Sequence, residues 1–195
     1  MPSLFESEHF SIRELRREQL PNLQTLFEGD PEYFVIISGK PPASDEAQRE
    51  LDALPPPGLP YSSRWFAGIF DTRNLLKGVV VLVTDFVASR VWHIALFFLD
   101  RELRGLGAAM EVHGALEAKA IASGACWLRL VVMSGNPSAE RFWVKCGYVQ
   151  VRTRPDSNAT GQPGAARVMV KPLGGSTLTE YLKVVPRDQP SSPLP

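Results

Sequence analysis

The stretch IALFFLDRELRGLGAAM, residues 94–110, joins an apolar segment to a predicted helix through a turn that contains two glycines. Helices commonly begin with Ser, Thr, Asp or Asn, whose side-chain oxygen accepts a hydrogen bond from an amide of the first turn. Gly105 and Gly107 stand here instead and offer no side-chain acceptor. Glycine lets the backbone approach a bound molecule closely, and a helix N-terminus favours negative charge. The turn therefore predicts a site for an anion such as pyrophosphate, to which Arg101 and Arg104 add positive charge.

The two glycines could also serve only a tight turn and the close packing of a helix on a sheet, and the turn alone leaves both readings open. Met110 stands where a dinucleotide-binding G-x-G-x-x-G motif has its third glycine. The phosphate-binding motif G-x-x-x-x-G-K-[ST] does not occur in the sequence. These two differences disfavour a dinucleotide-binding protein and a nucleoside triphosphatase.

The composition indicates one globular domain with no overall charge. Of the 195 residues, 44% are apolar and 22% are charged, and 21 basic residues balance 21 acidic ones. A neutral chain has no general attraction for nucleic acid or an anionic membrane, so we expect neither as a partner. Two cysteines and three histidines show no metal-ligand spacing, so we expect no metal and a reducing, cytoplasmic setting. The apolar runs are too short to span a bilayer, and the first residues lack the pattern of a secretory signal.

Hydrophobic periodicity predicts an α/β (α+β) fold: a mixed, mostly antiparallel sheet of about seven strands flanked by helices. The long helix between the strands at 91–99 and 126–133 requires these two strands to run parallel. The expected strands cover residues 9–15, 64–70, 75–86, 91–99, 126–133, 148–154 and 166–173. The expected helices cover residues 19–29, 30–39, 43–54, 104–122 and 136–147.

We expect the folded domain to span residues 1–173, with a Gly-, Asn- and Pro-rich loop between its last two strands. Residues 174–195 form a predicted C-terminal tail. Within it, LTEYLKVV (178–185) could pair with a sheet edge or a neighbouring subunit, and the end, RDQPSSPLP, has the composition of a disordered segment.

Three segments in this order resemble the GNAT superfamily of acyl-CoA-dependent N-acyltransferases: the stretch at 94–110, the strand LRLVV (128–132) and NPSAERFWVKCGY (136–148). The resemblance covers roughly residues 8–173, and its specific motifs lie between 91 and 148. Gly105 and Gly107 match the family signature [Q/R]-x-x-G-x-[G/A], but the first position is Glu102 here. The resemblance implies a splayed sheet and acetyl-CoA as the cosubstrate.

The resemblance also implies which residues contact acetyl-CoA. The backbone at the end of the strand at 91–99 would hold the pantetheine arm and the acetyl carbonyl, and the amides of the glycine turn would hold the pyrophosphate. The start of the helix at 136–147 would line the opposite wall. The implied cofactor-binding residues are Phe97, Phe98, Leu99, Arg104, Gly105, Leu106, Gly107, Ala108, Asn136, Ala139 and Phe142.

The reaction implied by the resemblance is direct attack of a neutral amine on the acetyl thioester, which needs a base for the amine proton. We expect His93 to be this base, because it precedes Ala95 and Phe97 by two and four residues and period-two geometry would place all three on one face. Its ordinary pKa also suits proton removal near neutrality. The alternative is a structural histidine, in which case Asp85 and Glu32 are the reserve candidates.

The family often places a tyrosine, as the acid for the leaving thiolate, at the position that Trp143 occupies here. Indole cannot donate its proton in this way, so the thiolate leaves unassisted, another group or water serves, or catalysis has been lost. His9, His113 and Cys146 are expected to be structural. We expect the acceptor site near residues 30–38 and 61–65.

The sequence therefore predicts an N-acetyltransferase that acts on a primary amine of a small molecule or peptide. Two alternatives stay open: a non-catalytic acyl-CoA-binding regulatory domain, which Trp143 favours, and a structural or interaction protein, whose tail could pair subunits of a homodimer.

Overall fold

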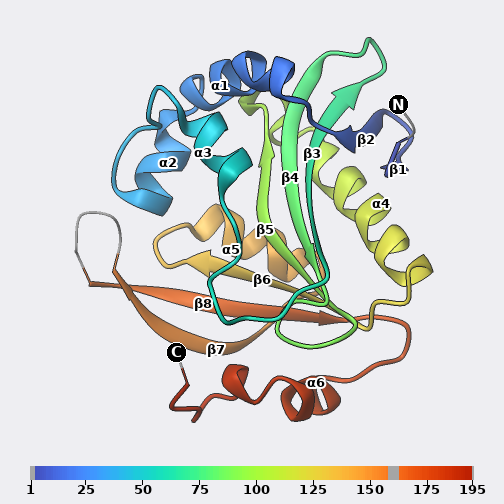
Figure 1. Ribbon diagram of the computed structural model, residues 1–195, viewed down its shortest axis with the longest axis vertical. Coiled ribbons are helices and arrows are strands. Elements are labelled where there is room, and N and C mark those ends of the chain that lie inside the picture. The colour runs from blue at the N-terminus through green and yellow to red at the C-terminus, as the bar shows by residue number, and fades with distance from the viewer. Residues whose placement is uncertain (1–2, 158–162, 195) are drawn as a thin grey trace.

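The computed structural model describes residues 3–157 and 163–194 (Figure 1). Eight strands in this part of the chain form one sheet in the order β1-β2-β3-β4-β5-β6-β8-β7, and of these neighbours only β5 and β6 are parallel. The mixed, mostly antiparallel sheet is confirmed; it has eight strands because a two-residue strand extends the edge. The strands are β1 (Phe5–Glu6), β2 (Phe10–Glu14), β3 (Ser63–Asp71), β4 (Leu76–Thr84), β5 (Val91–Leu99), β6 (Trp127–Met133), β7 (Val149–Ser157) and β8 (Pro163–Pro172).

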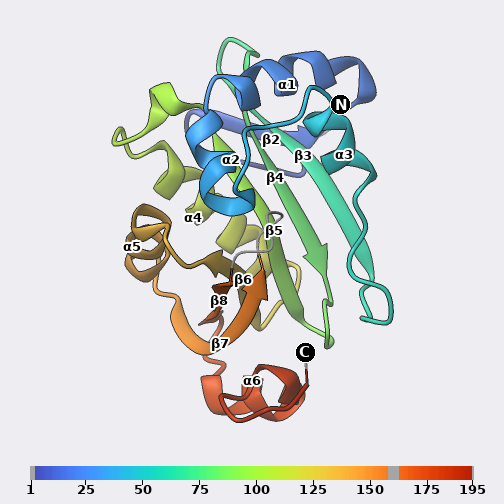
Figure 2. The same ribbon diagram turned by 90° about the vertical axis from the view of Figure 1, so that its left-hand side faces the viewer.

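Helices cover both faces of the sheet. Figure 2 shows α4 and α5 on one side of the central strands and α3 on the other. Two clusters of buried hydrophobic residues hold these layers together, one between the sheet and α4 and α5 and one beneath α1 to α3. The helices are α1 (Leu20–Glu28), α2 (Pro31–Ser38), α3 (Glu46–Asp52), α4 (Ala108–Ala122), α5 (Pro137–Lys145) and α6 (Leu178–Val184), with short 3₁₀ turns at Arg17–Gln19, Arg101–Leu103 and Pro186–Asp188.

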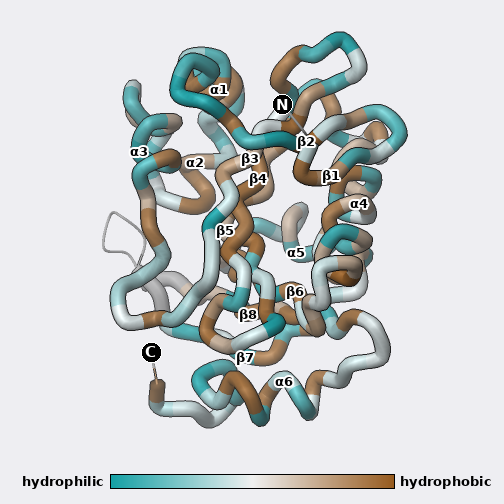
Figure 3. The backbone as a smooth tube through the Cα atoms, turned by 45° about the vertical axis from the view of Figure 1, so that its right-hand side comes forward, coloured by the Kyte–Doolittle hydropathy of each residue, from teal (hydrophilic) through white to brown (hydrophobic). Residues whose placement is uncertain are grey.

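Hydrophobic segments lie mainly in the strands, enclosed by helices with hydrophilic outer turns (Figure 3). Among the described residues, no helix is both long enough and apolar enough to cross a bilayer. Both cysteines are buried as free thiols. The predicted loop between the last two strands lies partly outside the described residues, since 158–162 are not among them.

The strand β5 contains one extra residue in its pairing with β4. Ile94 and Leu96 pair with consecutive residues of β4, so Ala95 has no partner there. Such a bulge reverses the alternation of side chains along the strand. Phe97 consequently packs on the α4 and α5 side, whereas His93 lies on the α3 side. The expectation that His93, Ala95 and Phe97 share one face is wrong for this reason.

The parallel pair β5 and β6 separates halfway along its length. Their pairing runs from Val91 opposite Trp127 to Ile94 opposite Leu130, and no pair follows among the described residues. Beyond this point β5 continues upright while β6 turns across the base of the molecule (Figure 1). The sheet is therefore splayed, as the resemblance implied, and the β5 backbone after Ile94 has one edge that no strand covers in the described part of the chain.

Pairing of 178–185 with a sheet edge, one of the two possibilities for this segment, does not occur, because these residues form α6 beneath the sheet (Figure 1). The hydroxyl of Thr177 accepts a hydrogen bond from the amide of Glu180 at 3.2 Å, and the Glu180 carboxylate accepts one from the amide of Thr177 at 2.8 Å. This capping box fixes the start of the helix. Tyr181 and Val185 are then fully buried against β6 and β8. The packing continues into RDQPSSPLP, because Asp188 is fully buried and the Gln189 side chain donates to the carbonyl of Leu182 at 2.9 Å.

Candidate active site

A groove with a volume of about 490 Å³ runs between the end of β5, the glycine turn and the first turns of α4 and α5. We call it the cofactor groove. Every cofactor-binding residue implied by the resemblance lines it except Leu106 and Ala108. Its lining residues are Tyr33, Ile36, Phe97, Phe98, Leu99, Leu103, Arg104, Gly105, Gly107, Ala109, Met110, Asn136, Ser138, Ala139, Phe142, Trp143 and Lys145.

The glycine turn leaves several amides free at the start of α4. Gly105 and Gly107 have φ values of 76° and 87°, a left-handed conformation that favours glycine. This conformation delays α4 until Ala108, four residues later than predicted. The amides of Gly105, Gly107 and residues 108–110 have no hydrogen-bond partner within the described chain. They form a row of donors that the helix dipole supports, which is the geometry of an anion site.

The two residues that miss the groove have different surroundings. The Leu106 side chain is 74% exposed, and its amide donates to the carbonyl of Leu103 at 3.4 Å. The Ala108 side chain is buried in the core, so the free backbone amide is the only group of this residue that a ligand at the helix start could contact. Leu106 therefore has no free group of the kind that the resemblance implied.

Two charged side chains beside the turn, Arg104 and Glu102, already have partners. The guanidinium of Arg104 forms an ion pair with the buried carboxylate of Asp30, which ties the turn to the start of α2. Glu102, the departure from the family signature, lies with its carboxylate 3.6 Å from the ammonium of Lys77 and does not line the groove. Its negative charge is thus turned away from the free amides.

The opposite wall of the groove is aromatic and contains no acid at the position of the usual tyrosine. Asn136 caps α5 by accepting a hydrogen bond from the amide of Ala139 at 3.0 Å. Phe142 stacks on Phe97 with ring centroids 6.0 Å apart, and Trp143 meets the same ring edge-on at 5.5 Å. Trp143 is buried in this aromatic cluster, so its indole serves packing.

Tyr33 is a groove residue that sequence reasoning missed. Its ring lies 5.1 Å from Phe98, and it lines the cofactor groove together with Ile36 of the same helix. Burial, and secondarily the Glu50 carboxylate, raise the pKa of the Tyr33 hydroxyl, which therefore remains protonated. Residues 30–38, expected at the acceptor site, thus contribute to the groove instead. Only the tertiary fold brings α2 to the end of β5.

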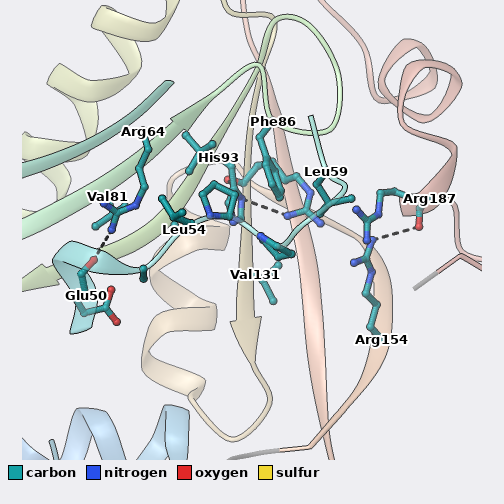
Figure 4. Close-up of a pocket in the computed structure, with 16 residues that line it drawn as sticks. Glu50, Leu54, Leu59, Arg64, Val81, Phe86, His93, Val131, Arg154 and Arg187 are labelled. Atoms are coloured by element: carbon teal, nitrogen blue, oxygen red, sulfur yellow. Dashed lines mark hydrogen bonds between the residues drawn. The ribbon is translucent and has the colours of Figure 1, made fainter. Parts of the chain in front are cut away.

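A second pocket of about 310 Å³ lies on the α3 side of the sheet (Figure 4). We call it the acceptor pocket. Ala95 and Val131 line it where β5 and β6 separate, and of the segment 61–65 only Arg64 contributes. Its lining residues are Glu50, Ala53, Leu54, Pro55, Pro56, Leu59, Arg64, Val81, Val83, Phe86, His93, Ala95, Arg129, Val131, Arg154 and Arg187.

His93 lies in the middle of the acceptor pocket (Figure 4). Its Nδ1 is 3.1 Å from the carbonyl of Arg129, which requires a donor, and 3.3 Å from Nη1 of Arg129, which requires an acceptor, so the two contacts favour opposite tautomers. The ring stacks on Phe86 with centroids 4.7 Å apart. Burial, and then the charge of Arg129, lower the pKa of His93 to about 3. The imidazole is therefore neutral at physiological pH, and one of its two nitrogens carries no proton.

The reserve candidates for the base lie elsewhere. Neither Asp85 nor Glu32 lines the groove or the acceptor pocket. Asp85 accepts a hydrogen bond from the amide of Arg90 at 2.6 Å within the turn between β4 and β5. That contact gives Asp85 a structural role.

The other three chemically notable side chains also have structural partners. His113 is buried with its Nε2 3.1 Å from the hydroxyl of Tyr148, and His9 contacts the Glu111 carboxylate at 3.1 Å. Cys146 packs with its Sγ 3.4 Å from the Met110 sulfur, and burial raises its pKa to about 11.

A matched family model now places the chain in a class of enzymes. The fold is that of the acyltransferases that take their acyl group from acetyl-CoA. The model of the acetyltransferase (GNAT) family matches residues 13–148, and the chain belongs to this family. A search of curated protein sequences found no match.

Many solved structures share the fold. An acetyltransferase from Thermus thermophilus is 21% identical, with a TM-score of 0.65 over 84% of this chain and 97% of that chain. Spermidine N-acetyltransferase from Vibrio cholerae, solved in complex with CoA and spermine, is 16% identical, with a TM-score of 0.63 over 83% and 94%. The ribosomal-protein-S18-alanine N-acetyltransferase from Escherichia coli is 12% identical, with a TM-score of 0.61 over 86% and 96%. At these identities the likeness establishes the fold.

Proposed function

We propose that the protein transfers an acetyl group from acetyl-CoA to a primary amine of a small molecule or peptide. The row of free amides at the start of α4, open to the cofactor groove, carries this proposal. A pyrophosphate needs several donors at once, and this helix start supplies them where the β5 backbone has an uncovered edge. The two structural neighbours named for spermidine and for a ribosomal protein alanine support a nitrogen acceptor.

The separation of β5 and β6 gives the two ligands access to each other. Residues from the end of β5 line the cofactor groove on one side of the sheet. Ala95 of β5 and Val131 of β6 line the acceptor pocket on the other side. Acetyl-CoA bound along β5 would present its thioester at this opening. An amine in the acceptor pocket would then attack the carbonyl carbon.

In the proposed reaction, the new C–N bond forms as the C–S bond breaks. The nitrogen becomes acidic once it bonds to the carbonyl carbon, so in the tautomer whose Nδ1 donates to the Arg129 carbonyl the weakly basic Nε2 of His93 can take its proton directly or through water. Trp143 supplies no acid, and the sulfur leaves as a thiolate, which is a weak enough base to depart without one.

A regulatory acyl-CoA-binding domain is the second candidate function. Trp143 in place of the tyrosine and the low pKa of His93 favour it, because both reduce the acid and base catalysis available. Release of free CoA thiol in the presence of an amine separates the two functions.

The first experiment is calorimetric titration of acetyl-CoA into the purified protein and into Gly107→Glu. The substitution places bulk and negative charge among the free amides, so we expect acetyl-CoA binding to fall by at least about a hundredfold. Gly124→Glu is the matched control, because Gly124 has a φ of 83°, has open space at its Cβ position and follows the other end of the same helix.

We expect Gly124→Glu to bind acetyl-CoA like the parent protein. Absence of binding by the parent would reject both the enzyme and the regulatory domain. Equal binding by parent and Gly107→Glu would reject the placement of the pyrophosphate at this turn.

A further inference from the structure

The charged groups of the acceptor pocket are mostly cationic. Among the described residues that line it, four are arginines, Arg64, Arg129, Arg154 and Arg187, and one is a carboxylate, Glu50. Figure 4 shows Arg154 and Arg187 at one end, Glu50 and Arg64 at the other, and His93 between them. A pocket of this composition repels a cation and attracts an anion.

One buried carboxylate serves two of these arginines. The Asp188 carboxylate accepts hydrogen bonds from Nε of Arg129 at 2.8 Å and from Nη2 of Arg129 at 3.2 Å. It also forms an ion pair with Arg154. The same carboxylate accepts a hydrogen bond from the hydroxyl of Tyr181. Asp188 is fully buried and carries a single negative charge. One negative charge cannot neutralise two guanidinium groups.

Arg154 retains unused hydrogen-bonding capacity. Its Nε is buried and has no hydrogen-bond partner within the described chain. A buried donor without a partner costs free energy that an acceptor on a ligand would recover. Burial and the neighbouring charges of Arg129, Arg187 and Arg152 lower the pKa of Arg154, and Asp188 only partly offsets them.

The opposite end of the pocket does not need an anion. Arg64 donates to two backbone carbonyls of α3, those of Glu50 and Leu51. The Glu50 carboxylate lies nearby and acts electrostatically on the Arg64 guanidinium. Among the described residues, the excess of positive charge is therefore greatest at the Arg154 end, where Arg129 and Arg154 share the Asp188 carboxylate.

We propose that the acceptor carries an anionic group, a carboxylate or a similar oxyanion, in addition to its primary amine. The anion lies at the Arg154 end of the acceptor pocket, and the amine lies beside His93 and Ala95, toward the opening to the cofactor groove. This inference rests on the proposed function and names its substrate class. A polyamine, which is cationic at both ends, does not suit this pocket.

The test compares matched pairs of amines in acetyl-transfer assays: ω-amino acids of two to six carbons and L-α-amino acids, each against its own carboxamide, with cadaverine as the diamine. We expect the best carboxylate to exceed its carboxamide at least about tenfold in kcat/KM, because the carboxylate gains charge-assisted hydrogen bonds. Arg154→Gln should raise KM for the carboxylate about tenfold and affect the carboxamide less, so that the preference for the carboxylate falls.

Arg152→Gln is the control, because Arg152 lies on the same strand, donates to the carbonyls of Arg187 and Ser192, and does not line the pocket. It should preserve the preference for the carboxylate. Arg154→Lys keeps the charge without the planar fork and should retain part of the preference. Circular dichroism of each variant confirms that it is folded.

Equal rates for carboxylates and carboxamides, a preference for cadaverine, or an equal loss with both substrates in Arg154→Gln would overturn the inference. If no amine is turned over, calorimetric titration of the N-acetylated carboxylates and carboxamides in the presence of CoA decides it, and absence of a carboxylate preference again overturns it. Titration with acetyl-CoA alone reports separately whether the proposed function stands.

Discussion

His93 is held by the neighbouring parallel strand, with its Nδ1 3.1 Å from the carbonyl and 3.3 Å from Nη1 of Arg129. Burial keeps the ring neutral, so the residue is not a group that titrates near neutrality. Its position on the acceptor side of the sheet follows from the extra residue at Ala95. The proposed base therefore acts on the amine without touching the cofactor groove.

His93→Gln should lower kcat at least about a hundredfold, since glutamine preserves polarity but is not a base at nitrogen. The affinity for acetyl-CoA should not change, because His93 does not line the cofactor groove. Because the pKa of His93 is about 3, the pH profile of the wild-type enzyme should show no ionisation of this residue near 6.5. Steady-state kinetics from pH 5 to 9 check both points, and an unchanged kcat in the variant would show that His93 is structural.

At the scale of elements, the helices α4 and α6 differ in how the free amides at their first turns are satisfied. The helix α4 begins at Gly107 without a side-chain cap and leaves its amides free, whereas α6 begins with a reciprocal capping box between Thr177 and Glu180. The capping box satisfies two amides of α6 within the chain, whereas the first amides of α4 are left to water or a ligand. This contrast is the reason why we propose a binding role for the start of α4 and a structural role for α6.

Thr177→Ala should reduce the free energy of unfolding by about 1 kcal/mol, the usual cost of losing an N-cap. Ser176→Ala is the matched control, because the Ser176 side chain has no hydrogen bond within the described chain. Urea unfolding of the three proteins measures the difference. Equal losses in both variants would mean that the capping box does not stabilise α6.

At the scale of the whole molecule, the buried neutral side chain of His113 links the free energy of unfolding to pH. His113 is buried, and burial together with the charge of Lys171 lowers its pKa from 6.5 to about 4. The unfolded chain therefore binds a proton at His113 between pH 6.5 and 4 that the folded chain does not. The stability contribution is complete above pH 6.5 and is lost as the pH falls toward 4.

Between pH 7 and 5, the free energy of unfolding should fall by about 2 kcal/mol on account of His113 alone, from the difference between its two pKa values. His113→Gln should remove this part of the pH dependence. His9→Gln, a change at an exposed histidine, is the control. Denaturant unfolding at the two pH values gives the answer, and an unaltered pH dependence in His113→Gln would contradict the assignment.

The sequence by itself determined the elements whose signals are local. Alternating apolar residues predicted the strands, Asn136 and Pro137 predicted the start of α5, and Gly105 with Gly107 predicted a turn with free amides. Pairing of 178–185 with a sheet edge does not occur, and the signal for the helix found there was local, since the spacing of Thr177 and Glu180 is that of a capping box.

Only the tertiary structure decided which residues form the acceptor pocket. A bulge at Ala95 cannot be read from alternation, because it is set by pairing with β4, and it moved His93 to the opposite face from Phe97. Arg129, Arg154 and Asp188 come from three distant segments, and their meeting depends on α6 packing beneath the sheet. Local periodicity specifies elements over a few residues, whereas charge balance in a pocket depends on contacts between residues far apart in the chain, and these exist only once the chain has packed.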